Sequence, residues 1–333
     1  MDCHAVAWSL VDSMLVITNA GAGGAESGAE EPALALLSDA GPLDVVATAT
    51  RDDIEQALSD HDGRTVVVMG GDGTMHAVVA ALLTSGRLAY TPVALVPLGT
   101  GNDFARGLGI PLNSVEAAQQ LLTVSPRPLD LVVDDEGGVV VNAVYVGVGV
   151  EAAVEAHGLK SRYGRFGYVL GAVRTGFVTP GLFLRVVVDG EVVTDGGVRV
   201  LQVAIGNGRF VAGGVPLLPA AVADDGRVDV VVSFAMSTPR RFVYALGARL
   251  GLHPGNPDVS TFRGSRVHVE SANGFRWNAV ARCAGRRGAA SGTYSRTPGP
   301  CWRCHPTASA SPRPAAARHV KRSESQPSNS ATA

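Results

Sequence analysis

The chain has 333 residues, of which 46% are hydrophobic and 17% charged, so it is long enough for two domains with a sizeable core. Nine of the 28 Lys and Arg residues but one of the 30 acidic residues lie in 280–333, which leaves the first 279 residues with a net charge of −10. An acidic body excludes nucleic-acid binding as the main function. No apolar run reaches the roughly 18 residues that span a bilayer, and the N-terminus lacks a basic flank, so a cytoplasmic protein is expected.

Short apolar runs alternate with helical patterns over the first 127 residues. The expected strands are Leu15–Thr18, Asp44–Ala47, Val66–Met69 and Val93–Val96. The expected helices are Glu30–Ala40, Ile54–Leu58, Thr74–Leu83, Phe104–Leu108 and Val115–Leu122. Strands that alternate with helices favour a parallel sheet covered on both faces. The sequence therefore predicts an α/β domain over residues 14–127.

From about Leu129 the chain becomes rich in β-type segments separated by turns that contain Gly or Asp. The expected strands are Val139–Val150, Leu182–Val188, Val198–Ile205, Val228–Phe234 and Arg266–Ser271, with helical stretches near Tyr168–Thr175 and Pro239–Leu250. This pattern predicts a second, mainly antiparallel domain over residues 128–279. The basic segment Lys160–Arg165 is either a solvated loop or a contact for lipid head groups.

Two glycine-rich turns each follow an apolar strand and precede a helix. They are Gly70-Gly71-Asp72-Gly73-Thr74 and Pro97-Leu98-Gly99-Thr100-Gly101-Asn102-Asp103. Glycine lets a bulky anion approach the backbone, and the N-terminus of the following helix offers free N–H groups. Because consecutive parallel strands bring both turns to one edge of the sheet, the sequence predicts a phosphate site there. The first turn lacks the Gly-Lys-Ser/Thr of a P-loop and the spacing of a dinucleotide fingerprint.

Polar residues in these turns have a functional and a structural interpretation. Asp72 either holds a magnesium nucleotide or orients a hydroxyl, or else it stabilises the turn. Asp103 has the same options, or it caps the helix at Phe104. Thr74 donates a hydroxyl or caps its helix, and His76 either approaches the nucleotide or lies on the helix surface.

These turns, extended to Arg106, resemble the catalytic domain of the diacylglycerol kinase and sphingosine kinase superfamily. Asn142–Ala153 resembles the segment that opens the family's second domain. The signature of that second domain is matched by Gly206–Gly214, Pro219-Ala220 and Asp225–Val230. The resemblance covers about residues 14–279. It implies a three-layer α/β ATP-binding domain, as in NAD kinases and diacylglycerol kinases, a β-sandwich-like second domain and an active cleft between the two.

The turns and the resemblance together give the candidate site residues. Those expected to bind ATP are Asn19, Thr50, Gly70, Gly71, Asp72, Gly73, Thr74, His76, Gly99, Thr100, Asn102 and Asp103. The family's structural Mg²⁺ site matches Asp225, with backbone carbonyls near Val222 and Arg227. The family usually has Asn-Pro at the first turn, whereas this chain has Asn19-Ala20, which leaves the Asn in place.

Residues 280–333 depart from the family's pattern. The family carries an Asp-Gly-Glu motif soon after the segment that resembles Phe275–Ala279, and its Asp is the family's proposed catalytic base. This chain has Val280-Ala281-Arg282-Cys283, so the catalytic candidate is Asp72 and no base is carried over. The composition predicts a disordered tail or a reading-frame slip near residue 280. Cys301–His305 fits the pattern for haem attachment, but the absence of an export signal disfavours haem, and the spacing from Cys283 disfavours zinc.

The sequence therefore predicts an ATP- and Mg²⁺-dependent lipid kinase that transfers the γ-phosphate to a diacylglycerol-like or sphingoid hydroxyl. Its partner would be a lipid at a membrane surface, which adds peripheral membrane contact to the expected cytoplasmic location and suggests a role in phospholipid biosynthesis. Family members often dimerise, so a homodimer is compatible with the resemblance. Two alternatives stay open: a nucleotide- or lipid-binding pseudoenzyme that lacks the base, and an NAD kinase, which shares the first turn but normally has a later Asn-Glu motif.

Overall fold

The computed structural model describes residues 13–19, 28, 30–60, 63–147 and 180–271, and the backbone of 276–283. The turn after Asn19, the basic segment Lys160–Arg165, the helical stretch Tyr168–Thr175 and the chain from residue 284 onward lie outside the described residues. The haem and zinc interpretations of Cys301–His305, which the sequence disfavours, and the predicted frame slip therefore stay untested.

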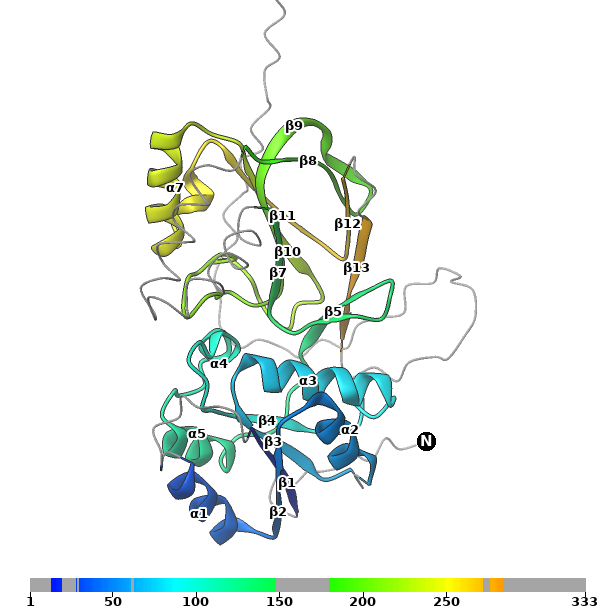
Figure 1. The fold of residues 1–333 in the computed structure, drawn as a ribbon, viewed down its shortest axis with the longest axis vertical. Helices are drawn as coiled ribbons and strands as arrows, with labels where there is room; N and C mark the ends of the chain where they lie inside the picture. The colour runs from blue at the N-terminus through cyan, green and yellow to red at the C-terminus, as the bar shows by residue number, and fades with distance from the viewer. Residues whose placement is uncertain are drawn as a thin grey trace, which may run out of the picture. The chain divides into compact units, whose positions relative to one another are not determined.

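The N-terminal part contains a four-stranded parallel sheet in the order β2-β1-β3-β4 (Figure 1). Its strands are β1 (Met14–Asn19), β2 (Leu43–Thr48), β3 (Thr65–Gly70) and β4 (Val93–Pro97). Its helices are α1 (Glu31–Ala40), α2 (Arg51–Ser59), α3 (Asp72–Thr84), α4 (Asp103–Leu108) and α5 (Ser114–Leu121). The predicted α/β fold is thereby confirmed, with every expected strand and helix present.

Helix α2 begins three residues before its expected start at Ile54. The Thr50 hydroxyl accepts a hydrogen bond from Asp53 N, and the Asp53 carboxylate accepts one from Thr50 N. This reciprocal capping box starts the helix ahead of its first apolar residue. The two backbone N–H groups that the Asp53 carboxylate accepts, from Ala49 and Thr50, lower the pKa of this exposed group.

Alternate residues of the buried strands pack on opposite faces of the parallel sheet. On one face, Leu15, Ile17, Val66 and Val68 pack with apolar residues of α2 and α3. On the other, Met14, Val16, Val67 and Met69 pack with α1 and α5. The sheet is thus the middle of three layers, which leaves its carboxyl edge as the place where the loops carry polar groups.

The second sheet has nine strands in the order β11-β10-β9-β8-β12-β13-β5-β6, with β7 paired to β9, and all its pairings are antiparallel. Its strands are β5 (Asp130–Asp134), β6 (Val139–Val140), β7 (Ala143–Gly147), β8 (Leu182–Val188), β9 (Glu191–Gly206), β10 (Val228–Phe234), β11 (Val259–Gly264), β12 (Arg266–Ser271) and β13 (Arg276–Cys283). The predicted antiparallel second half is confirmed.

Strand β5 contributes to both apolar cores. Leu131 and Val133 pack in the core that contains α2 and α3, whereas Val132 packs among the strands of the antiparallel sheet. Because successive side chains of a strand point to opposite faces, this single strand connects the two cores.

Two segments of the antiparallel sheet differ from their prediction. The single strand expected over Val139–Val150 is broken between β6 and β7, where the Asn142 carbonyl accepts hydrogen bonds from Asn207 N (3.1 Å) and Gly208 N (2.9 Å). Strand β13 continues to Cys283, four residues beyond the expected boundary, because Val280–Cys283 pairs with β5. The local amino-acid composition signals neither the break between β6 and β7 nor the extension of β13.

Helix α7 (Thr238–Arg249) packs one side against the antiparallel sheet and is followed by the short helix η1 (His253–Gly255). The Tyr244 hydroxyl lies 2.9 Å from Ser233 Oγ, and the His253 ring stands edge-on to Tyr244, with ring centroids 5.9 Å apart. His253 is 1% exposed, and its Nε2 lies 3.0 Å from the Leu217 carbonyl. Burial lowers the pKa of His253 and raises that of Tyr244. Neutral rings therefore fill this corner of the core.

We expect the folded chain to lose stability as the pH falls below about 6.5, the usual pKa of histidine. The unfolded imidazole takes up a proton there that buried His253 resists, so the unfolded state binds more protons and stability falls with pH. Urea unfolding at pH 7.5 and 5.5, compared with His253→Gln, measures this. The loss should be smaller in the variant, and an identical loss in both proteins would contradict the assignment.

Candidate active site

The first glycine-rich turn joins β3 to α3 and leaves the start of α3 open. The first intrahelical bond runs from Met75 N to the Gly71 carbonyl (3.1 Å), so the N–H groups of residues 72–74 precede it. Gly73 is exposed, and a Cβ atom placed on it would meet nothing within 4 Å. Free N–H groups beside open space at the positive end of a 13-residue helix are suited to binding an anion.

The second turn, between β4 and α4, packs directly on the first. Gly70 pairs with Pro97 in the sheet, and Leu98 N donates to the Gly70 carbonyl (2.9 Å). A Cβ on Gly99 would lie 2.6 Å from Gly71 Cα and 2.8 Å from Asn102 Oδ1. Gly99 is therefore needed for contact between the turns, whereas Gly73 faces open space. The expectation that both turns meet at one sheet edge agrees with this geometry.

Asp72 connects the two turns through hydrogen bonds. Its Oδ2 accepts from Asp103 N (3.0 Å) and its Oδ1 from Phe104 N (2.9 Å), which are the first N–H groups of α4. A carboxylate at a helix N-terminus satisfies unpaired donors and complements the helix dipole. The structure thus gives Asp72 the turn-stabilising role, with both oxygens engaged.

Asp103 extends the same network into the antiparallel part. Its Oδ2 accepts from Gly213 N (2.9 Å) and its Oδ1 from Gly214 N (2.7 Å). Gly213 has φ 81° and Gly214 has φ 106°, conformations in which successive N–H groups form a concave anion-binding nest. Asp103 therefore links two segments 110 residues apart in the chain, a role that its position at the start of α4 did not reveal.

The other predicted residues either lie at the sheet edge that carries the two turns or point away from it. Asn19 Nδ2 lies 3.4 Å from Thr74 Oγ1, so the end of β1 meets the first turn. Asn102 has a left-handed conformation (φ 50°), donates to the Gly99 carbonyl (2.7 Å) and keeps its buried Oδ1 without a hydrogen-bond partner, while Thr100 next to it is exposed. Thr50 caps α2 at the same sheet edge. His76 turns away, with Nε2 2.9 Å from the Val139 carbonyl of β6.

Arg106 is a site residue that the sequence analysis quoted without assigning it a role. Its Nε donates to the Gly101 carbonyl (3.1 Å), and a Cβ on Gly214 would lie 3.7–3.8 Å from its side chain. The guanidinium is thereby held beside the second turn, and the residue remains exposed. Guanidinium groups bind phosphate oxygens with two parallel hydrogen bonds. The sequence signal for Arg106 was its place in the first turn of the helix that follows the second glycine-rich turn.

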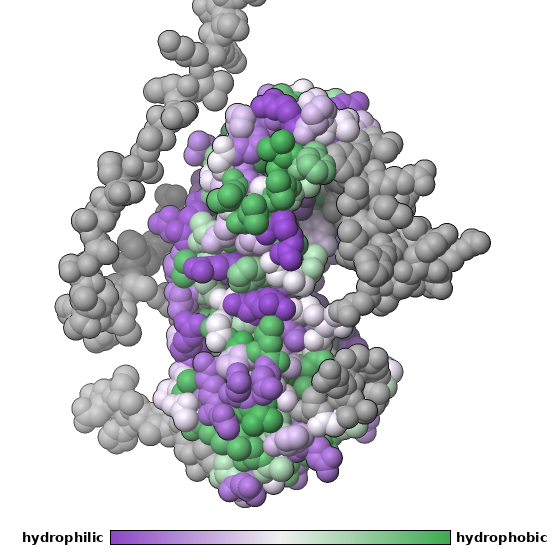
Figure 2. Space-filling view, turned by 90° about the vertical axis from the view of Figure 1, so that its left-hand side faces the viewer, coloured by the Kyte–Doolittle hydropathy of each residue, from purple (hydrophilic) through white to green (hydrophobic). Residues whose placement is uncertain are grey.

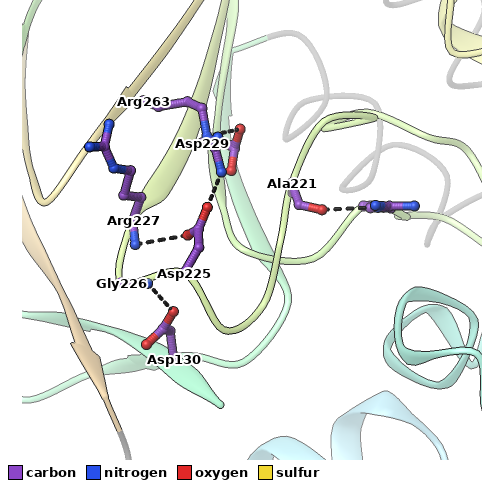
Figure 3. Close-up of polar contacts among 8 residues, drawn as sticks. Asp130, Ala221, Asp225, Gly226, Arg227, Asp229 and Arg263 are labelled. Atoms are coloured by element: carbon purple, nitrogen blue, oxygen red, sulfur yellow. Dashed lines mark hydrogen bonds and ion pairs between the residues drawn. The ribbon is translucent and has the colours of Figure 1, made fainter. Parts of the chain in front are cut away.

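Asp225, one of the predicted metal residues, lies near the carboxylates of Asp130 and Asp229 (Figure 3). Asp225 accepts from Arg227 N (3.0 Å) and forms an ion pair with Arg263, whose Nε also lies 3.2 Å from Asp229 Oδ1. Asp130 accepts from Gly226 N (2.5 Å). Two carboxylates, those of Asp225 and Asp229, thus meet the Arg263 guanidinium.

Burial raises the pKa of Asp130 and Asp229. The Gly226 N–H opposes this for Asp130, and the negative charge of Asp225 adds to it for both groups. For Asp229, the charge of Arg263, a hydrogen bond from the Val222 backbone and the charge of Arg209 oppose the effect of burial. An excess of carboxylate suits a hard cation, which prefers oxygen ligands.

The predicted Mg²⁺ residues fit this environment in charge and donor type. One carboxylate and two backbone carbonyls, from Asp225, Val222 and Arg227, are all oxygen donors. Within the described ranges, no three His, Cys, Asp or Glu side chains converge as metal ligands, so the backbone carbonyls are essential to any such site. Arg263 forms an ion pair with Asp225, and Asp229 offers the same guanidinium an alternative partner.

Two family models match consecutive parts of the chain. The diacylglycerol kinase catalytic domain matches residues 13–133, and the YegS C-terminal NAD kinase beta sandwich-like domain matches residues 142–298. The first includes both glycine-rich turns and Asp130, and the second includes Gly213, Gly214, Asp225 and Asp229. The two matches therefore define the class: proteins with a diacylglycerol kinase catalytic domain.

Named relatives narrow this class. "Probable lipid kinase YegS-like" of Pseudomonas aeruginosa is 37% identical over 232 residues, which are 68% of this chain and 72% of the relative. The protein of the same name from Xanthomonas oryzae pv. oryzae is 36% identical over 200 residues, and the match spans 57% of this chain but 63% of that relative's length. The chain belongs to the YegS-like lipid kinase family.

A solved structure shares the fold. The crystal structure of a diacylglycerol kinase from Bacillus anthracis str. Sterne superposes with a TM-score of 0.64 over 82% of this chain and 95% of that one, at 24% identity. In the part of the chain that the structure describes, no helix is long and apolar enough to cross a membrane.

Proposed function

We propose that this chain is an ATP-dependent lipid kinase that transfers the γ-phosphate to the hydroxyl of a diacylglycerol-like or sphingoid lipid. The observation that carries the proposal is the open N-terminus of α3 beside Gly73, packed on a second glycine turn. Membership of a lipid kinase family supports it. The diacylglycerol-like or sphingoid identity of the acceptor is also part of the proposal.

Each part of the site has a task in this proposal. The first-turn N–H groups of α3 bind phosphate oxygens, and the open side of Gly73 admits them. Arg106 neutralises charge on the transferred group, which is the main contribution that a protein makes to phosphoryl transfer. Asp72 and Asp103 hold the two turns and the Gly213–Gly214 nest in register. Mg²⁺, when bound with the nucleotide, would supply further charge neutralisation.

A nucleotide-binding pseudoenzyme is the second candidate. Both turn carboxylates accept two backbone N–H groups each, so neither is poised to take a proton from a hydroxyl. Strand β13, where the family's acidic motif is expected to follow, reads Arg-Trp-Asn-Ala-Val-Ala-Arg-Cys. These two observations favour binding without transfer.

Radiolabelled ATP with diacylglycerol or sphingosine in mixed micelles separates the candidates. Labelled lipid supports the kinase, and its loss in Arg106→Gln would place the activity at this site. Tight ATP binding with no labelled lipid supports the pseudoenzyme. Labelled NADP, formed when NAD replaces the lipid as the acceptor, would contradict both candidates.

We expect Mg²⁺ to stabilise the chain through Asp225. An ion present at about 100 times its dissociation constant raises the free energy of unfolding by about 2.7 kcal/mol. Thermal unfolding with Mg²⁺ and with EDTA, without nucleotide, measures this for the wild type and Asp225→Asn. The control is Asp224→Asn, whose carboxylate pairs with Arg127 at 2.8 Å. An equal response to Mg²⁺ in Asp225→Asn and the wild type would refute the metal assignment.

A further inference from the structure

Helix α7 and the turn after it expose large apolar side chains that the fold does not use. Phe242, Val243, Leu246, Leu250 and Leu252 are each between 56% and 68% exposed. The packed side of the helix is formed instead by Arg241, Tyr244 and Ala248. Figure 2 shows apolar side chains gathered over this helix. A contiguous exposed patch of this kind, here called the α7 face, marks an interaction surface.

The charge around the α7 face identifies its partner. Residues 230–258 contain three arginines, of which Arg241 is buried, and one acidic residue, Asp258, although the first 279 residues have a net charge of −10. Arg249 is exposed in the last turn of the helix, and Arg240 is exposed at its start, where it lies 3.1 Å from Asp258. A helix with an exposed apolar face flanked by arginines is typical of segments that lie in the plane of an anionic membrane surface.

We propose that the α7 face docks on an anionic phospholipid bilayer, with Phe242 and Leu246 inserted among the acyl chains and Arg249 at the head groups. The biological role of this docking rests on the proposed function, since a kinase for a bilayer-resident lipid must work at the bilayer surface. The binding itself requires neither ATP nor catalysis. Apolar insertion supplies most of the affinity, and the arginines supply a preference for anionic lipid.

Co-sedimentation of the full chain with vesicles, without ATP, tests this directly. The wild type should bind phosphatidylcholine vesicles that contain phosphatidylglycerol more tightly than vesicles of phosphatidylcholine alone. Phe242→Ser with Leu246→Ser should weaken binding to both by at least about 30-fold, at roughly 0.8 kcal/mol per buried methylene. Arg249→Gln should weaken binding to the anionic vesicles by about fivefold and leave binding to the neutral vesicles unchanged.

The matched control is Val45→Ser with Leu112→Ser, which removes two exposed apolar side chains from the N-terminal part. It should bind vesicles as the wild type does, and thermal unfolding checks that all variants fold. Failure of the wild type to bind, or equal loss in the control, would overturn the proposal. So would a wild-type dimer that Phe242→Ser with Leu246→Ser converts to monomers without a change in vesicle binding.

Activity on a dispersed short-chain diacylglycerol separates this inference from the proposed function. That acceptor needs no bilayer, so the Phe242 and Leu246 double variant should phosphorylate it at the wild-type rate. Vesicle binding that depends on the α7 face, in a chain inactive on this acceptor, would support the docking surface and count against the kinase alone.

Discussion

Gly73→Asp should abolish ATP binding while the fold remains as stable as the wild type or more so. A carboxylate in the first turn of α3 complements the helix dipole, which stabilises helices by about 0.3–1 kcal/mol. The same carboxylate would stand where the phosphates bind. Two like charges about 4 Å apart cost about 4 kcal/mol at an effective dielectric constant near 20, so we expect affinity to fall by at least about 100-fold.

Isothermal titration with ATP and urea unfolding measure the two effects of Gly73→Asp. Gly73→Ala is the matched uncharged variant: its methyl group meets no protein atom within 4 Å, so the fold should be unaffected and ATP affinity should fall less than in Gly73→Asp. Gly99→Ala should behave in the opposite way. Its Cβ would lie 2.6 Å from Gly71 Cα, so it should lose about 1–3 kcal/mol of stability. Unchanged ATP affinity in Gly73→Asp would remove the first turn from the site.

Asp103→Asn should cost about 2 kcal/mol of stability and reduce kinase activity at least about tenfold. The substitution turns an amide NH₂ toward Gly213 N or Gly214 N, and a hydrogen bond to a charged group contributes about 1.5–3 kcal/mol. The second turn then loses its connection to the nest. Urea unfolding gives the stability, and activity is compared at a temperature at which both proteins are folded.

Asp189→Asn controls for the loss of a carboxylate that connects distant segments. Asp189 accepts hydrogen bonds from Ser265 N (3.0 Å) and Arg266 N (2.8 Å) within the antiparallel sheet. It is exposed, so we expect a smaller stability loss of about 1 kcal/mol. Its activity should match the wild type. Equal losses of activity in both variants would show that Asp103 acts through general stability alone.

The sequence was sufficient to predict the two sheets and the meeting of the two turns. Alternation of Val66–Met69 and Val93–Val96 with helices identifies parallel strands, and glycine at their ends marks the turns. These features depend on residues close together in the chain. The same local logic located α7 within one residue, from Pro239–Leu250 to Thr238–Arg249.

What the sequence did not predict are the partners of single side chains across long separations. Asp72 reaches N–H groups 31 and 32 residues away, and Asp103 reaches the Gly213–Gly214 nest, so composition around either residue contains no trace of the bond. His76 has a helix-surface position in the sequence, but its partner is the carbonyl of Val139, 63 residues later. The exposed α7 face went unnoticed because exposure depends on which side of a helix the sheet covers.

Transfer of label from γ-labelled ATP to diacylglycerol in mixed micelles is the most direct test of the central claim, that the paired turns bind ATP for phosphoryl transfer to lipid. The account predicts labelled lipid from the wild type and none above background from Gly73→Asp, with both proteins folded. Labelled lipid formed equally by Gly73→Asp would contradict it.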